Sequence, residues 1–174
     1  MPDPLVFEDL NTIPRRHLFT LFGVPWNATP SVWIGRVVFL AVGVLVALAF
    51  GQNILTGIAF GIVLELSYFF HDVGHVLGGK AVGSPMDEAL VTTIRHVNYY
   101  RGVQDFPKQV HLGRALGGPL LNSTIGLLML ILWQSTDSPI FLFAVFINLG
   151  VFGLGSLLPL PSIDGEVIWR ELRR

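Results

Sequence analysis

The stretch Ser67-Tyr-Phe-Phe-His-Asp-Val-Gly-His-Val-Leu-Gly78 ends a long apolar run and holds two histidines, His71 and His75. On an α-helix, residues four apart differ in direction by only about 40°, so both imidazoles face the same side, one turn apart. A single metal ion could bind both. The zinc-binding motif H-E-x-x-H uses this spacing, with its Glu as general base, and Asp72 occupies that Glu position here.

The composition around this stretch is that of a membrane protein. Of 174 residues, 52% are hydrophobic and 13% are charged, and the mean hydropathy is +0.62. Four apolar segments are long enough to cross about 30 Å of hydrocarbon as helices: residues 32–50, 54–75, 115–133 and 140–158. The sequence predicts an all-α polytopic membrane protein, with about four transmembrane helices and short β pieces in the N-terminal segment and the cytoplasmic loop.

The basic residues predict the orientation of these spans, because Lys and Arg are retained on the cytoplasmic side. None of the eleven falls in the short connections 51–53 and 134–139. We therefore expect a multi-pass protein of the cell membrane with both termini cytoplasmic. The first residues lack the pattern of a cleavable signal peptide, so we expect the mature chain to begin at Met1. The net charge of −1 predicts no nucleic-acid partner.

Two regions are expected outside or around the spans. Residues 1–31, with several prolines, are predicted to be an interfacial segment with a short strand near residues 22–26, and residues 32–174 a single membrane-embedded core. The loop 80–114 contains β-rich pieces such as residues 90–95. A free strand edge there would suit an extended substrate peptide, although a solvated loop fits equally well. His96 and His111 are expected to be surface or capping histidines.

Other polar groups at membrane depth are candidates for a site. Glu65 shares a helix face with Asp72 and should face a polar cavity or a ligand. Asn122 needs a partner, which could be another helix or a bound molecule. Pro159 and Pro161 are predicted to break the last helix and Gly165 to permit a turn, which leaves Asp164 at the depth of the two histidines. Its carboxylate could complete a three-ligand zinc site that keeps a fourth position open.

Taken in order, three runs resemble the site-2 protease family of intramembrane zinc metalloproteases: the H-x-x-x-H helix, Gly118-Pro-Leu-Leu-Asn122, and Leu157-Leu-Pro-Leu-Pro-Ser-Ile-Asp-Gly165. The stretch Phe22-Gly-Val-Pro-Trp26, followed by Pro30-Ser-Val-Trp33, also resembles the approach to that family's first core helix. The resemblance implies zinc held by His71, His75 and Asp164, and Asn122 near the substrate carbonyl. It implies cleavage of transmembrane segments of other proteins, and no inserted PDZ or appended CBS module is expected.

The chain departs from the family pattern at two places. Asp72 replaces the catalytic Glu, and Gly155-Ser156 replaces the Phe-Asn usually found before Leu-Leu-Pro. Asp is one methylene shorter, so its carboxylate would sit about 1.5 Å further from the reacting water, and a misplacement of about 1 Å can cost around a hundredfold in rate.

Three hypotheses follow. In the first, the chain is a zinc peptidase in which Asp72 accepts the proton and Asn122 assists the oxyanion, acting on a membrane-protein substrate or within a larger membrane complex. In the second, it is a non-enzymatic subunit or pseudoprotease whose metal site is structural or empty. In the third, His71 or His75 is an axial ligand of haem or chlorophyll, which leaves Asp164 without a role.

Overall fold

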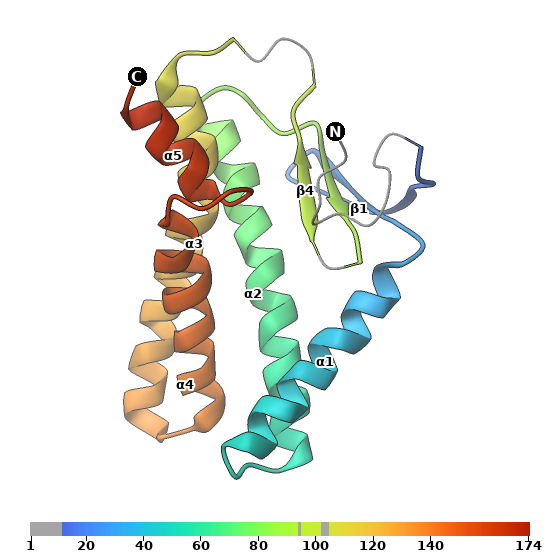
Figure 1. Ribbon diagram of the computed structural model, residues 1–174, viewed down its shortest axis with the longest axis vertical. Helices are drawn as coiled ribbons and strands as arrows, with labels where there is room; N and C mark the ends of the chain where they lie inside the picture. Colours follow the sequence, from blue (N-terminus) through green and yellow to red (C-terminus); the bar gives the residue numbers. More distant parts are fainter. Residues whose placement is uncertain (1–11, 94, 102–104) are drawn as a thin grey trace.

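In the computed structural model, which describes residues 12–93, 95–101 and 105–174, four apolar helical spans carry a small sheet at one end (Figure 1). The spans are α1 (Val32–Ala49), α2 (Ile54–Ala81), α3 (Lys108–Thr136), and α4 (Pro139–Val145) continued by the π-helix η1 (Phe146–Leu154) and the 3-10 turn η2 (Gly155–Leu157). The predicted fold class, helical with short β pieces, is confirmed.

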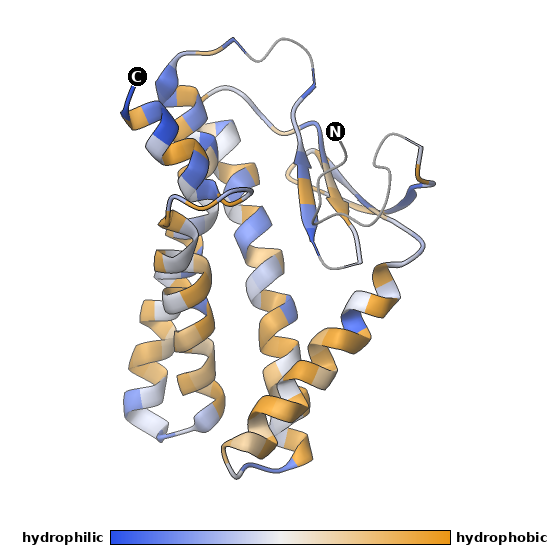
Figure 2. Ribbon diagram, viewed as in Figure 1, coloured by the Kyte–Doolittle hydropathy of each residue, from blue (hydrophilic) through white to orange (hydrophobic). Residues whose placement is uncertain are grey.

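Within the described residues, four helices are long and apolar enough to cross a membrane. Their ribbons are orange, the colour of hydrophobic residues, over most of their length (Figure 2). Exposed leucines, isoleucines, valines and phenylalanines cover α1 and the first half of α2. These features support an integral membrane protein, while the orientation in the membrane stays a prediction.

Two helix boundaries differ from those predicted. The second helix continues to Ala81, and the third begins at Lys108, about two turns before the predicted start. Lys80, Lys108 and Arg114 are therefore helical residues that continue the spans past the apolar core. Hydropathy marks only the part of a helix that lies in hydrocarbon, so it misses such polar extensions.

Small residues allow the helices to approach closely. A Cβ on Gly43 of α1 would lie 2.3 Å from the backbone nitrogen of Gly61 of α2. A Cβ on Gly74 of α2 would lie 2.4 Å from the carbonyl oxygen of Gly117 of α3. In membranes such contacts replace the hydrophobic driving force between helices. Because α1 diverges from α2 towards the sheet, α2 and α3 form the close pair at that end (Figure 1).

The sheet has the order β1-β2-β3-β4, with β1 (Arg16–Leu21), β2 (Val24–Ala28), β3 (Glu88–Val91) and β4 (His96–Tyr99). Phe22 and Gly23, at φ of 52° and 79°, form the two-residue turn between antiparallel β1 and β2. The second strand then pairs in parallel with β3, and β3 with β4 in antiparallel fashion. This leaves β4 at one edge of the sheet.

The sheet is attached to the helices by an apolar core. Trp26 and Val24 of β2 pack with Val73 and Val76 of α2. The first two strands belong to the segment predicted to be interfacial, and the second of them, β2, pairs directly with β3 of the loop between α2 and α3. The interfacial position of residues 1–31 stays a prediction, and residues 1–11 lie outside the described part. The final helix, α5 (Asp164–Leu172), packs on α3 at the same end as the sheet.

Candidate metal centre

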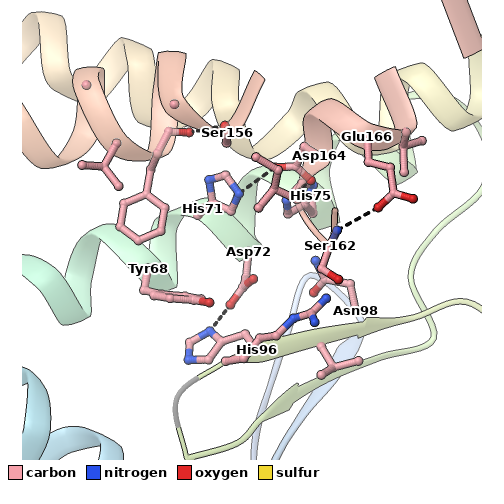
Figure 3. A pocket seen from close by; sticks show the side chains of 18 of the residues that line it. Tyr68, His71, Asp72, His75, His96, Asn98, Ser156, Ser162, Asp164 and Glu166 are labelled. Carbon is pink, nitrogen blue, oxygen red and sulfur yellow. Dashed lines mark hydrogen bonds and ion pairs between the residues drawn. The ribbon is translucent and has the colours of Figure 1, made fainter. Parts of the chain in front are cut away.

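Two imidazoles from α2 and one carboxylate from α5 meet at a single point. Nε2 of His71 lies 3.0 Å from Oδ2 of Asp164, and Nε2 of His75 lies 3.3 Å from Oδ1. The three ligand atoms lie within 4.8 Å of one another, and both histidines are buried. Figure 3 shows the three side chains converging from their two helices. The predicted meeting of His71, His75 and Asp164 is therefore observed.

Glycines make room for this arrangement. A Cβ on Gly118 of α3 would lie 2.6 Å from Nε2 of His75 and 2.8 Å from Nε2 of His71. A Cβ on Gly165 would lie 1.9 Å from the carbonyl oxygen of Leu158. The turn predicted at Gly165 is wrong, because this glycine lies in α5 and its missing side chain lets the helix start pack against the preceding segment. That contact places Asp164 at the histidines.

The second ring nitrogen of each histidine is held by α3. Nδ1 of His71 donates to Oδ1 of Asn122 at 3.0 Å, and Nδ1 of His75 donates to the carbonyl oxygen of Arg114 at 2.8 Å. Both Nε2 atoms are thereby directed at Asp164. Two imidazoles oriented by such bonds, together with one carboxylate, form the donor set of an open zinc site. Axial ligation of a haem or chlorophyll gains no support, since both Nε2 atoms point to a carboxylate.

The Asp164 carboxylate is prepared for a cation. Burial alone would raise its pKa, but the His75 charge and hydrogen bonds from His71 and His75 outweigh burial and hold the pKa of this carboxyl well below its usual range. The group is therefore ionised at neutral pH, as a metal ligand must be.

Asn122 lies directly behind His71, and its place near a substrate carbonyl stays a prediction. Its side chain is fully buried, and its Nδ2 donates to the carbonyl oxygen of Ser67 at 3.0 Å and to Oδ1 of Asn148 at 2.8 Å. It is not among the residues that line the cavity beside the candidate ligands. Its carboxamide bonds three neighbours, one of which is His71. Asn122 therefore links helices, which is one of the two roles that the sequence left open.

Asn148 and Ser67 complete this buried network, and sequence reasoning did not single out either residue. Nδ2 of Asn148 donates to Oγ of Ser67 at 2.8 Å and to the carbonyl oxygen of Ala144 at 2.9 Å. Asn148 lies in η1, and a π-helical turn inside a helix often accompanies a functional site. An asparagine within an apolar span was the available signal for it.

Asp72, adjacent to the first histidine, is bound by the sheet. Its Oδ2 accepts a hydrogen bond from Nδ1 of His96, the first residue of β4. The prediction of His96 as a surface or capping histidine is wrong, since its side chain is 5% exposed. Oδ1 of Asp72 has no hydrogen-bond partner among the described residues, and the residue lines the cavity. Glu65 instead pairs with Arg36 of α1 at 2.7 Å, so it faces a neighbouring helix.

A cavity of about 780 Å³ opens beside the candidate ligands. Its walls come from α2, the edge strand β4, the apolar face of η1 and the segment leading into α5, several of whose side chains are drawn in Figure 3. One wall thus offers a strand edge that no other described strand pairs with, and the opposite wall offers apolar side chains. Such a space suits an extended, apolar chain.

No protein-family model matches the chain. It is 27% identical over 160 residues to a zinc metalloprotease of Methanocaldococcus jannaschii, across 89% of this chain and 44% of the relative. The chain is a homologue of the site-2 proteases. A solved structure of the site-2 protease from the same organism has the same fold, with a TM-score of 0.63, 24% identity, and coverage of 92% of this chain and 72% of that one.

This site-2 protease homologue spans 44% of the length of the curated relative that it matches. It has a His-His-Asp cluster formed by α2 and the start of α5, with Asp72 at the position where the family resemblance implies Glu. Ser156, part of the Gly155-Ser156 pair that departs from the family pattern, donates through Oγ to the carbonyl oxygens of Phe152 and Gly153 in its own span. The hydroxyl therefore bonds backbone next to the site.

Proposed function

We propose that this chain is an intramembrane zinc metallopeptidase that hydrolyses peptide bonds of membrane-embedded proteins. The observation that carries the proposal is the convergence of His71, His75 and Asp164 on one point beside a cavity with an open strand edge. The proposed partners are a membrane-protein substrate, or a larger membrane complex, and the lipid bilayer, with no nucleic acid. The proposed location is the cell membrane, with both termini cytoplasmic.

The three ligands fit zinc in number and type, and zinc bound there would polarise the peptide carbonyl and acidify a water molecule. The protein's own contribution is orientation. His71 and His75 are each fixed from behind by α3, so neither ring needs to rotate when the site is used. Preorganised groups of this kind lower the barrier because they pay no reorganisation cost during the reaction.

Asp72 is the proposed proton acceptor. Its Oδ2 is held by His96, its Oδ1 has no partner among the described residues, and Asp72 lines the same cavity as His71 and His75. A carboxylate held at one oxygen has a fixed direction for the other, and this partly offsets the shorter side chain of Asp. The role needs hydrogen-bond reach of the reacting water, which a small shift of α2 would alter.

The substrate is proposed to enter as an extended strand along β4. Within the described part of the chain this strand is at the edge of the sheet, and it lines the cavity through His96, Val97 and Asn98. Opposite it, Phe146, Val151 and Phe152 supply apolar contacts for residues leaving the membrane. A helical substrate must unwind to pair in this way, so helix-weakening residues near the cut should favour cleavage.

The test of this proposal begins with metal content. Purified protein is expected to hold about one zinc ion per chain, and His71→Ala or Asp164→Ala should abolish that binding. Folded protein that takes up no zinc would reject the proposal. With zinc present, cleavage of a membrane-embedded reporter should fall for Asp72→Asn and be preserved or rise for Asp72→Glu.

A second candidate function, a catalytically weak or inactive protease-like subunit, is favoured by one observation. Asp72 directs an oxygen at His96, and its atoms are not part of the three-ligand cluster. In that case the unmodified chain and the Asp72→Glu variant would both bind zinc, and neither would cleave the reporter. If the Asp72→Glu variant cleaved the reporter and the unmodified chain did not, the metal site would be competent and the Asp72 side chain too short to act as the base.

A further inference from the structure

The face of β4 that looks towards α2 carries His96 and, two residues later, Asn98. Residues alternate between the two faces of a strand, so both side chains project to the same side. His96 is committed to Asp72. Asn98 lines the large cavity, and Figure 3 shows it beside the segment that leads into α5.

Asn98 lies where two cavities meet. A second cavity of about 330 Å³ adjoins the first, and the residues that line both are His75, Asn98, Asp164 and Val167. Two of these four are candidate metal ligands. A peptide that occupied both cavities would therefore lie next to Asn98 and the candidate metal centre.

The carboxamide of Asn98 is available for a ligand. Its side chain makes no hydrogen bond to the residues that the structure describes, and its Oδ1 is buried. A buried amide oxygen without a partner is unfavourable, because it has lost water and gained nothing in return. Such a group is expected where a ligand supplies the missing bond.

Three other polar side chains close to the site do not have this freedom. The carboxamides of Asn122 and Asn148 are both used within the buried network, and the Ser156 hydroxyl bonds backbone carbonyls. Asn98 differs from all three, since neither its donor nor its acceptor is used by the described residues and it lines the cavity. One carboxamide can bond the C=O and N–H of a peptide backbone.

We propose that Asn98 hydrogen-bonds a main-chain peptide group of the substrate next to the candidate metal centre. The inference rests on the proposed function to the extent that the cavity receives a peptide. It assigns to Asn98 the substrate contact that the family resemblance had placed on Asn122. Because the contact is to backbone, it should not depend on the substrate's side chains.

The test compares Asn98→Leu with Asn27→Leu in the metal-free 174-residue chain. Leu has nearly the shape of Asn and removes both the donor and the acceptor. Asn27 lies in β2 of the same sheet, and its Nδ2 donates to Oε1 of Glu88 at 2.9 Å. The probe is a fluorescent polyleucine transmembrane peptide with two glycines near one end, in the same detergent micelles, and its affinity and the unfolding temperature are measured.

Asn98→Leu is expected to weaken peptide binding about tenfold and to leave the unfolding temperature equal or higher, because an unpaired polar group has been removed. Asn27→Leu should leave peptide affinity unchanged and lower the unfolding temperature, since it breaks an existing hydrogen bond away from the cavity. Zinc content after metal loading should stay the same for Asn98→Leu. Asn98→Gln, which keeps the carboxamide, should recover part of the affinity.

Four results would overturn the inference: no measurable peptide binding by the unmodified chain, unchanged binding by Asn98→Leu, loss of binding only in proportion to loss of stability, or loss of zinc by that variant. The last would make Asn98 a metal ligand. The proposed function fails separately, when the zinc-loaded chain binds the peptide and does not cleave it.

Discussion

Removing the Asn122 side chain should weaken metal binding although that residue touches no metal. Asn122→Ala takes away the acceptor of His71 Nδ1 at 3.0 Å and the donor to Asn148 at 2.8 Å. Loss of a partner that orients a ligating histidine typically costs about 10- to 100-fold in metal affinity, or about 1.4–2.8 kcal/mol. The unpaired groups left behind would also destabilise the fold by about 1–3 kcal/mol each.

The assay separates these two effects. Zinc affinity is measured by competition with a chromophoric chelator, and stability by thermal unfolding of the metal-free chain in detergent. Asn148→Ala is the matched control, because Asn148 bonds Asn122 and Ser67 and does not touch His71. The control should lose stability while its zinc affinity stays close to that of the unmodified chain.

One result would refute this reasoning. If Asn122→Ala and Asn148→Ala lost stability to a similar extent and bound zinc equally well, the hydrogen bond to His71 would have no part in setting that ring for a metal. Asn122 would then be a structural link between helices only.

Three further predictions concern the same end of the molecule and its helix contacts. Gly118→Ala should lower zinc affinity by more than about tenfold, because its Cβ would lie 2.6 Å from Nε2 of His75; chelator competition would detect it, and normal affinity would contradict it. His96→Phe should lower kcat for reporter cleavage about 10- to 100-fold with little change in KM, since Asp72 loses its positioning contact; an unchanged kcat would deny that contact a catalytic role. Gly43→Ala should destabilise the metal-free chain by about 1–3 kcal/mol, because its Cβ would lie 2.3 Å from the backbone of the facing glycine on α2; an unfolding temperature equal to that of the unmodified chain would argue against this helix contact.

The success and failure of the individual residue predictions have physical reasons. The His71–His75 pair was predictable because helix geometry alone brings residues four apart to one face. Asp164 was placed correctly because a helix break after the last span limits where the next carboxylate can lie. His96 was misjudged because its contact with Asp72 depends on how a strand lies against a helix, and no local pattern encodes that.

Asn122 shows the same limit from inside the membrane. An amide in an apolar span must find a partner, and the sequence says so, but it does not say whether the partner is a ligand or another helix. The close contact of α2 and α3, made possible by facing glycines, decides the question by bringing Asn122 within reach of His71 and Ser67. The π-helical course of η1 then adds Asn148.

The sequence by itself indicated that the chain suits a lipid bilayer, how many helices could span it, and which residue types could hold a metal. Hydrophobicity and helical spacing are local properties of the chain, so no tertiary structure is needed to recognise them. Only the tertiary structure decided that His96 bonds Oδ2 of Asp72, that Asn122 holds Nδ1 of His71, and that Asn98 lines the same cavities as His75 and Asp164. These depend on contacts between elements far apart in the chain, where a difference of one hydrogen-bond length changes the role of a side chain.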